Sequence, residues 1–285
     1  MPKKRSSKKK SKRKSGKSAK PPKADRADKY DLYQLSVQVP DYEAIFLNRV
    51  YNEAYGEPAR VLREDFCGTF AICCEWVKKG QFREAIGVDL DPEPLDWGRE
   101  HNLAPLKPAQ KKRVTLMQAD VREVAGPKAD VVAAENFSWW IFKTRDELLE
   151  YFRAAHANLK KKGVFVLDLM GGSDVQVEEQ EDVHKYKGFR YVWEEERFDP
   201  VSHHCRFHIH FKFKDGSALK EAFTYDWRLW SIPEGRELLL EAGFKDVHVY
   251  WEGTDPKTGE GNDIYDRVTE APADAVWIAY LVAVK

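Results

Sequence analysis

The sequence predicts an α/β fold, in which a doubly wound, mostly parallel sheet carries an inserted antiparallel β-meander. Up to about residue 172, short segments that are apolar on both faces alternate with amphipathic segments. This alternation is typical of parallel strands covered by helices on both sides. Residues 189–230 are instead rich in aromatic and β-branched side chains and are broken by turn signals, which predicts antiparallel strands.

Hydrophobic periodicity places the elements of the first part. We expect helical structure within residues 30–55 and over 71–79, 93–102 and 145–159. The expected strands are residues 60–64, 84–89, 114–118, 129–134 and 163–169.

The meander is expected to contain strands at 189–198, 205–214 and 218–230. A helix over 233–242 and closing strands at 245–251 and 275–284 follow, separated by a polar loop with a candidate hairpin turn at 255–259. We therefore expect one domain over residues 29–285, in which the insert 174–231 forms a substrate lid.

The balanced net charge hides a basic N-terminal segment. Of the 47 Lys and Arg residues, eleven lie in residues 1–20, which contain no acid; the rest of the chain has 36 basic against 47 acidic residues. Residues 1–28 are predicted to form a disordered tail because they lack apolar anchors. The tail is expected either to contact nucleic acid or another polyanion, or to act only as a solubilising segment.

Several classes of protein are excluded. No apolar run approaches the 18 residues of a membrane-spanning helix, and the N-terminus lacks the apolar core of a signal peptide. Four cysteines without a C-x-x-C pair do not make a disulfide scaffold. We therefore expect a cytoplasmic protein without a membrane partner.

A ligand crevice is expected at the carboxyl ends of the parallel strands. The first strand runs into the turn Asp65-Phe66-Cys67-Gly68-Thr69-Phe70, and the second strand ends at Asp89. A carboxylate at that position can accept hydrogen bonds from both hydroxyls of a ribose. The turn is not G-x-G-x-x-G and has no Walker lysine, which disfavours binding of a pyrophosphate or triphosphate.

At these residues the chain resembles class I S-adenosylmethionine-dependent methyltransferases, in particular uncharacterised members with an Arg-Glu-Asp-Phe-Cys-Gly-Thr turn. The resemblance covers about residues 40–172 and 233–285, and it implies a Rossmann-like fold and S-adenosyl-L-methionine as cofactor. It also implies roles for residues at the ends of four strands. The expected cofactor-binding residues are Glu64, Cys67, Gly68, Asp89, Leu90, Asp120, Val121 and Asn136.

The turn departs from the family pattern at two positions. Phe66 and Phe70 stand where the family has its first and third glycines, so we expect a differently shaped turn. The alternative to the methyltransferase interpretation is a Rossmann-like domain that binds another adenosine compound.

Aromatic residues supply the candidate substrate site, because an aromatic wall suits a cationic donor. Arg228 is expected to grip a carboxylate or phosphate, and Tyr225 is the candidate proton acceptor. The alternative for the aromatic residues is packing in the core or at a dimer surface. The expected substrate-binding residues are Phe137, Trp139, Trp193, Trp227 and Arg228, with Trp140 a further candidate for the aromatic wall.

The histidines of the meander do not predict a metal site. His204, His208 and His210 share one face of an expected strand, and Cys205 lies on the other with His203. No distant Cys/His pair completes a zinc site, so we expect no metal.

The sequence thus predicts an S-adenosylmethionine-dependent methyltransferase with a small-molecule acceptor. The basic tail suggests as an alternative an RNA or protein methyltransferase, although an Asn-Pro-Pro-Tyr-type motif is absent at residues 135–138. A non-catalytic protein that binds an adenosine ligand is the third hypothesis.

Overall fold

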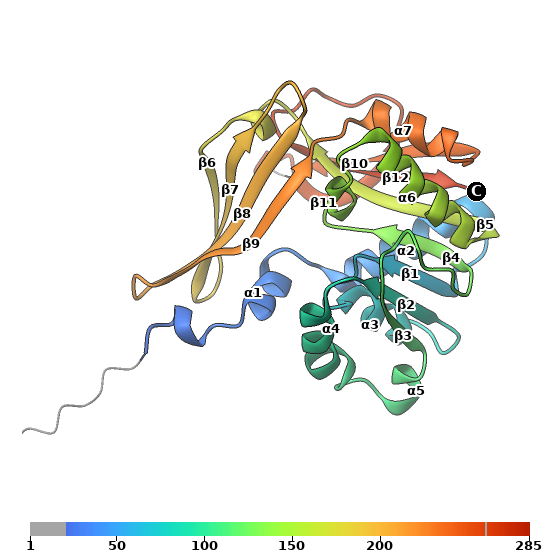
Figure 1. Cartoon of the computed structure of the whole chain (residues 1–285), viewed down its shortest axis with the longest axis horizontal. Coiled ribbons are helices and arrows are strands. Elements are labelled where there is room, and N and C mark those ends of the chain that lie inside the picture. The colour runs from blue at the N-terminus through green and yellow to red at the C-terminus, as the bar shows by residue number, and fades with distance from the viewer. Residues whose placement is uncertain (1–20, 260) are drawn as a thin grey trace, which may run out of the picture.

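The structure, a computed structural model, describes residues 21–259 and 261–285. Two sheets form its framework (Figure 1). The larger sheet, with eight strands, has the order β11-β10-β12-β5-β4-β1-β2-β3, and the smaller has the order β6-β7-β8-β9. The Lys-rich stretch of the predicted tail lies outside the described residues.

Strands β1 to β5 of the large sheet run parallel to one another. Strand β12 pairs antiparallel with β5, and β10 pairs antiparallel with both β12 and β11. The bounds of these strands are β1 Val61–Asp65, β2 Glu84–Asp89, β3 Val114–Gln118, β4 Ala129–Ala134, β5 Leu159–Gly171, β10 Asp246–Thr254, β11 Gly261–Val268 and β12 Trp277–Val284.

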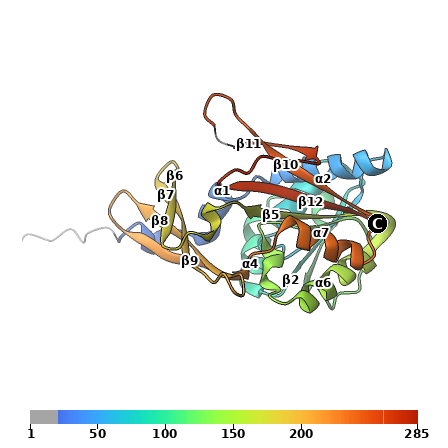
Figure 2. The same cartoon turned by 90° about the horizontal axis from the view of Figure 1, so that it is seen from above.

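Helices cover both faces of the large sheet (Figure 2). One hydrophobic cluster packs α2, α3 and α4 on one face, and a second packs α6 and α7 on the other. The bounds of the helices are α1 Lys29–Ser36, α2 Pro40–Tyr55, α3 Ala71–Lys78, α4 Pro92–Gly98, α5 Pro108–Lys111, α6 Arg145–Asn158 and α7 Ile232–Glu241. The short turns are η1 Ala24–Arg26, the π-helical η2 Arg99–Leu103, η3 Ser138–Ile141 and η4 Asp174–Gln176.

The small sheet stands beside the large one at the end where the parallel strands finish (Figures 1 and 2). Its strands are β6 Gln180–Lys185, β7 Phe189–Phe198, β8 His204–Phe213 and β9 Ala218–Arg228, all antiparallel. Helix α1 packs its Leu32 against Ile209 and Phe211 of β8 in a third hydrophobic cluster.

The doubly wound sheet and the inserted meander are confirmed, whereas some boundaries differ. Strands β6 and β11 were not expected, because both are largely exposed and polar and therefore lack an apolar pattern. The predicted tail ends too late: η1 packs on the small sheet, where the backbone N–H of Ala24 donates to Ser217 Oγ at 3.1 Å.

Candidate functional site

A cavity of about 580 Å³ opens at the carboxyl ends of β2 and β3. Four of the predicted cofactor-binding residues line it: Asp89, Leu90, Asp120 and Val121. Phe66, Ile141 and Phe142 supply further apolar wall. Leu90 and Ile141 are 67% and 47% exposed, an unusual degree for large apolar side chains, so this cavity presents apolar surface to a ligand.

Asp89 joins the cavity to the turn after β1. Its Oδ2 accepts the Gly68 N–H at 2.7 Å, and its Oδ1 accepts the Asp91 N–H at 2.9 Å. Burial raises the pKa of Asp89, and these two N–H donors oppose the rise. Each carboxylate oxygen has a second lone pair for a ligand hydroxyl.

The turn after β1 keeps left-handed backbone without its expected glycines. The φ angles are +55° at Phe66, +51° at Gly68 and +47° at Phe70. This conformation is costly for a residue with a side chain. The substituted positions thus retain the φ that glycine favours, so these angles give no support to the expected change in turn shape.

The rings of the two phenylalanines explain how the turn tolerates this strain. Phe70 is fully buried, and its ring lies so close to Gly98 that a Cβ there would come within 2.5 Å of it. Phe66 contacts Phe142 and Tyr151, with ring centroids 6.0 and 5.4 Å away, and lines the cavity. Packing of the two rings, rather than the conformational freedom of glycine, therefore stabilises the turn.

Asp120 is held by Arg122, whose Nη2 lies 2.7 Å from Asp120 Oδ2. Its pKa is lowered by the hydrogen bond from this guanidinium. The backbone of Val121, the next residue, is also held in position, because Arg63 Nη2 donates to its carbonyl oxygen at 2.9 Å. The loop after β3 is thus anchored at both residues that line the cavity.

Three other predicted cofactor-binding residues lie beside the cavity rather than in its lining. The Cys67 side chain points at the sheet, since a Cβ on Gly87 would lie 2.9 Å from its Sγ. Glu64 is buried and accepts the Cys73 N–H at 3.0 Å. Gly68 contributes through its backbone N–H, as described for Asp89. Binding by Glu64, Cys67 and Gly68 therefore stays a prediction.

A second strained turn follows β4. Asn136 and Phe137 have φ of +59° and +56°, and their N–H groups donate to the two oxygens of Asp168 at 2.7 and 2.8 Å. Asp168 lies on β5, where its residue position pairs with Tyr280 of β12. The carboxylate of a neighbouring strand therefore sets the direction of this turn.

The predicted substrate residues fall into two groups. Trp139 and Trp140 are fully buried, and Trp139 Nε1 donates to the Asp168 carbonyl oxygen at 2.7 Å. Phe137 lies edge-on to Trp227 of β9 at 6.3 Å, so the small sheet touches this turn directly. Trp139 and Trp140 occupy core positions, whereas Phe137 remains partly exposed.

The meander aromatics form one continuous face. The rings of Tyr225 and Trp227 stack at 4.2 Å, and Trp193 lies 5.9 Å from Tyr225. Tyr225 shares a hydrogen bond with Tyr33 of α1, and burial raises its pKa well above 10. The phenol therefore stays protonated at neutral pH, which does not favour Tyr225 as a proton acceptor.

Arg228 is engaged within the protein. Its guanidinium lies 3.7 Å from the Trp230 ring centroid, Nη1 donates to the Lys143 carbonyl oxygen at 3.2 Å, and Nη2 pairs with Glu234 at 3.1 Å. A ligand carboxylate or phosphate would compete with Glu234 for this guanidinium, so its contact with substrate stays a prediction.

The histidines of β8 pair with neighbouring glutamates. His208 Nε2 lies 2.6 Å from Glu196 and His210 Nε2 lies 2.6 Å from Glu194. Within residues 21–259 and 261–285, no group of three or more His, Cys, Asp or Glu side chains is arranged to hold a metal ion.

Sequence reasoning missed a set of buried side chains. Arg63 Nε binds Asp65 Oδ1 at 2.6 Å below the cavity. Glu43, Glu135 and Asp168 are buried near the strand ends. A signal existed for two of them: Glu135 directly follows an apolar strand, and Asp168 interrupts the apolar run Gly163 to Leu169.

The site fits S-adenosyl-L-methionine in shape and charge. The exposed apolar side chains of Leu90 and Ile141 suit the faces of an adenine, and Asp89 suits ribose hydroxyls. Toward the ends of β1 and β4, Glu135 Oε1 and Glu43 Oε2 are buried without a hydrogen-bond partner. Carboxyl oxygens that are buried without a partner favour a ligand that brings positive charge.

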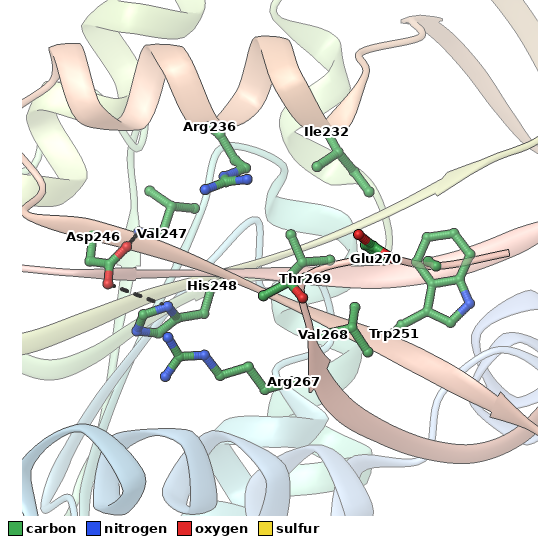
Figure 3. A pocket seen from close by; sticks show the side chains of 12 residues that line it. Ile232, Arg236, Asp246, Val247, His248, Trp251, Arg267, Val268, Thr269 and Glu270 are labelled. Atoms are coloured by element: carbon green, nitrogen blue, oxygen red, sulfur yellow. Dashed lines mark hydrogen bonds and ion pairs between the residues drawn. The ribbon is translucent and has the colours of Figure 1, made fainter. Parts of the chain in front are cut away.

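A second cavity, of about 320 Å³, lies between α7, β10 and β11 at the other edge of the large sheet (Figure 3). Arg236, Arg267 and His248 line it, and His248 Nδ1 lies 3.6 Å from Asp246. None of the predicted site residues borders this cavity, whereas four of them line the first one.

The chain is similar to known methyltransferases. Residues 65–167 match the sequence profile of a family described as a methyltransferase domain. YqeM of Bacillus subtilis (strain 168), a protein named as a methyltransferase, is 23% identical over 205 residues, which cover 66% of this chain and 75% of YqeM.

Solved structures share the fold. DesVI of Streptomyces venezuelae superposes with a TM-score of 0.64 at 20% identity, covering 92% of this chain and 98% of DesVI. CalS10, an amino pentose methyltransferase from Micromonospora echinaspora with S-adenosylmethionine bound, has a TM-score of 0.63 at 18% identity, covering 90% and 95%. An S-adenosylmethionine-dependent methyltransferase from Clostridium acetobutylicum ATCC 824 has a TM-score of 0.59 at 19% identity, covering 89% and 96%.

The Rossmann-like fold, the cavity at the strand ends and the methyltransferase domain together define the class of protein. Residues 65–167 form a methyltransferase domain, and the fold is shared by solved S-adenosylmethionine-dependent methyltransferases.

Proposed function

We propose that this enzyme transfers the methyl group of S-adenosyl-L-methionine to a small-molecule acceptor. The observation that supports this most directly is the cover over the strand ends. Tyr33 of α1 and Tyr225 of β9 share a hydrogen bond there. The Tyr33 hydroxyl lies near enough to Asp168 and Glu43 for their charges to raise its pKa. An acceptor must pass beneath this cover, which favours a small molecule over a macromolecule.

The donor would be held by residues around the first cavity. We assign Asp89 to the ribose hydroxyls, Asp120 and Val121 to the adenine, and the turn at Gly68 to the methionine portion. Leu90 and Phe66 would enclose the base. Bound there, S-adenosyl-L-methionine supplies an activated methyl group on a sulfonium. The protein then needs chiefly to orient the acceptor and exclude water, which is worth up to about 7–11 kcal/mol in favourable cases.

The insert 174–231 is proposed as the lid on the acceptor side. Phe137, Trp193 and Trp227 would form its aromatic wall, since Trp227 contacts Phe137 and the three rings belong to one hydrophobic cluster. Neighbours of similar fold include an amino pentose methyltransferase and a sugar N-methyltransferase from Streptoalloteichus. The sugar acceptors of these two proteins support a small polar molecule for this enzyme as well.

Two further proposals concern the cellular compartment of the enzyme and the partner of its basic segment. We place the enzyme in the cytoplasm because its four cysteines are free and buried. No helix in the described part of the chain is long and apolar enough to cross a membrane. A polyanion contact by the eleven basic residues of residues 1–20 is proposed from their charge alone, and deletion of residues 1–20 should leave turnover of a small acceptor unchanged.

The donor site is tested by calorimetry with S-adenosyl-L-methionine and its demethylated product. Asp89→Ala removes the acceptor of the Gly68 N–H and should weaken both ligands at least about tenfold. Asp96→Ala changes an exposed carboxylate on α4 and serves as the matched control. Equal binding by Asp89→Ala and the parent would refute the assignment.

The acceptor class is tested with isotope-labelled donor and cell extract. Label in the small-molecule fraction is the expected result. Label in RNA or protein instead would favour the macromolecular alternative, and donor binding without any labelled product would favour a non-catalytic binding protein.

A further inference from the structure

Four buried carboxylates lie near one another at the carboxyl ends of the parallel strands, where Glu64 pairs with Ala133 and Leu167 pairs with Ala134. They come from four different elements and are each at most 8% exposed. We call them the carboxylate cluster: Glu43 of α2, Glu64 of β1, Glu135 directly after β4, and Asp168 of β5.

The carboxylate cluster has no cation of its own. Among the described residues, none of the four forms an ion pair with Lys, Arg or His, although twenty such pairs occur elsewhere. Burial and mutual repulsion raise the pKa of Glu135 well above its ordinary value, with Asp168 and Glu43 as the nearest contributors. Burial likewise raises the pKa of Glu43 to about 8. An acidic site of this kind is costly unless a ligand compensates it.

All four members have a hydrogen-bond partner within the protein, but Glu43, which accepts the Val39 N–H, and Glu135, which is bonded to Tyr280, each keep one oxygen free. Glu64 accepts the Cys73 N–H, and Asp168 accepts two N–H groups of the turn after β4. Glu135 Oε1 and Glu43 Oε2 have no hydrogen-bond partner, although the residues are 96% and 92% buried. Buried polar atoms are almost always paired in native proteins. These two oxygens are therefore positioned for donors that a ligand brings.

The surroundings favour an organic ammonium over a metal ion. No described cluster is arranged as a metal site. Tyr280 of β12 shares a hydrogen bond with Glu135, and Tyr33 of α1 lies near enough to Asp168 and Glu43 for their charges to raise its pKa. Aromatic faces stabilise ammonium groups.

The carboxylate cluster has more acidic groups than the net charge of the methyl donor requires. The methyl donor carries one sulfonium, one ammonium and one carboxylate, a net charge of one. Glu64, beside the turn after β1, is the cluster member nearest in sequence to the donor site. The free oxygens of Glu135 and Glu43 remain for a second cation.

From this geometry we propose that the acceptor is a primary or secondary amine, bound as its ammonium by Glu135 and Glu43, and that Glu135 takes the proton that frees its lone pair. The proposal rests on the proposed function and specifies its substrate class. Glu135 would then be a catalytic residue and Glu43 a binding residue.

The ammonium gives one proton to Glu135 Oε1 and becomes a neutral amine. Its lone pair forms the new N–CH3 bond while the pair of the C–S bond stays on sulfur. The positive charge of the sulfonium ends on the methylated nitrogen, and the proton on Glu135 leaves to solvent when product departs. A carboxyl with a raised pKa is suited to hold that proton.

The test is calorimetric binding of matched amines and alcohols in the presence of the demethylated donor product. Ethylamine, cyclohexylamine and benzylamine are each compared with ethanol, cyclohexanol and benzyl alcohol. We expect at least one amine to bind and its alcohol to bind at least about tenfold more weakly, since an ion-paired hydrogen bond is lost. Glu135→Gln and Glu43→Gln should each weaken the amine at least about tenfold.

The control variant is Glu195→Gln on β7, whose half-buried carboxylate also has an unpartnered Oε2 but lies outside the cluster. It should bind the amine as the parent does. Because the isosteric glutamine removes charge repulsion, Glu135→Gln should also raise the melting temperature of the ligand-free protein, which confirms that the variant is folded.

The outcomes separate this proposal from the proposed function. The amine assignment is overturned if the parent binds the donor product but none of the amines, or if Glu135→Gln binds the amine as tightly as the parent does. Either result leaves the methyltransferase assignment intact. Loss of donor product together with amine in Glu135→Gln would place Glu135 in the donor site and also overturns it. Absence of donor binding in the parent would instead overturn the proposed function.

Discussion

The buried pair of Arg63 and Asp65 connects the stability of the enzyme to the cavity at the strand ends. Both side chains are about 1% exposed, and Arg63 Nε lies 2.6 Å from Asp65 Oδ1. Tyr151 donates to the other carboxylate oxygen at 3.1 Å. The guanidinium also donates to the carbonyl oxygens of Val121 and Val124, at 2.9 and 3.2 Å, in the loop after β3. The pair should therefore stabilise the fold and position the cavity wall.

Removal of either partner should be strongly destabilising. Arg63→Met leaves Asp65 buried and unpaired, and Asp65→Asn leaves a buried guanidinium without its counter-charge. Breaking a buried pair in this way costs about 3–5 kcal/mol. At about 2–4 °C per kcal/mol for a chain of this size, the melting temperature should fall by roughly 6–20 °C.

The double variant separates the two roles. With both charges gone, Arg63→Met/Asp65→Asn should be no less stable than either single variant, because no buried charge is left uncompensated. Its affinity for the demethylated donor product should stay reduced, since the carbonyls of Val121 and Val124 have lost their donor. Urea unfolding measures the free energies, and calorimetry measures the affinity.

Two results would refute this reasoning. One is a single variant that loses less than about 1 kcal/mol, which would mean that the pair is not held in a low-dielectric interior. The other is a double variant whose loss equals the sum of the single losses, which would mean that the two charges are not coupled.

Three further predictions follow from the site. Ligand-free protein should lose stability as pH rises from about 4.5 to about 8, because the carboxylate cluster has raised pKa values in the folded state. Each pKa unit at one group is worth about 1.4 kcal/mol of unfolding free energy. A melting temperature that rises over this pH range would contradict the prediction. Gly98→Ala places a Cβ 2.4 Å from the Thr69 carbonyl oxygen and should weaken donor binding about tenfold, whereas Gly80→Ala, whose Cβ meets nothing closer than 3.5 Å, should not. Tyr225→Phe should retain most of the kcat, since its phenol stays protonated; a loss above about a hundredfold would restore it as a proton acceptor.

The order of elements could be predicted because local pattern carries it. Strands β3 and β4 have the predicted bounds, since each is a short apolar run between turn residues. Asp89 and Leu90 were placed at the cavity for a related reason: the end of a parallel strand fixes where its last side chain lies. The exposed strands β6 and β11 were not predicted, because they are strands through hydrogen-bond pairing with a neighbouring strand and not through burial of an apolar face.

Roles that depend on contacts between distant segments could not be predicted. Arg228 carries the same charge whether it faces solvent or Glu234, and only the approach of α7 to β9 decides which. Phe66 and Phe70 look incompatible with a glycine turn until the packing around them is known.

The sequence by itself determined the fold class, the class of enzyme and the strand ends at which the cavity opens, because each depends on spacing along the chain. Only the tertiary structure decided that Glu43, Glu135 and Asp168 share one buried site beneath α1 and the small sheet. Segments more than a hundred residues apart in the chain meet there, and the charge, burial and unpaired oxygens of such a site exist only after they have folded together.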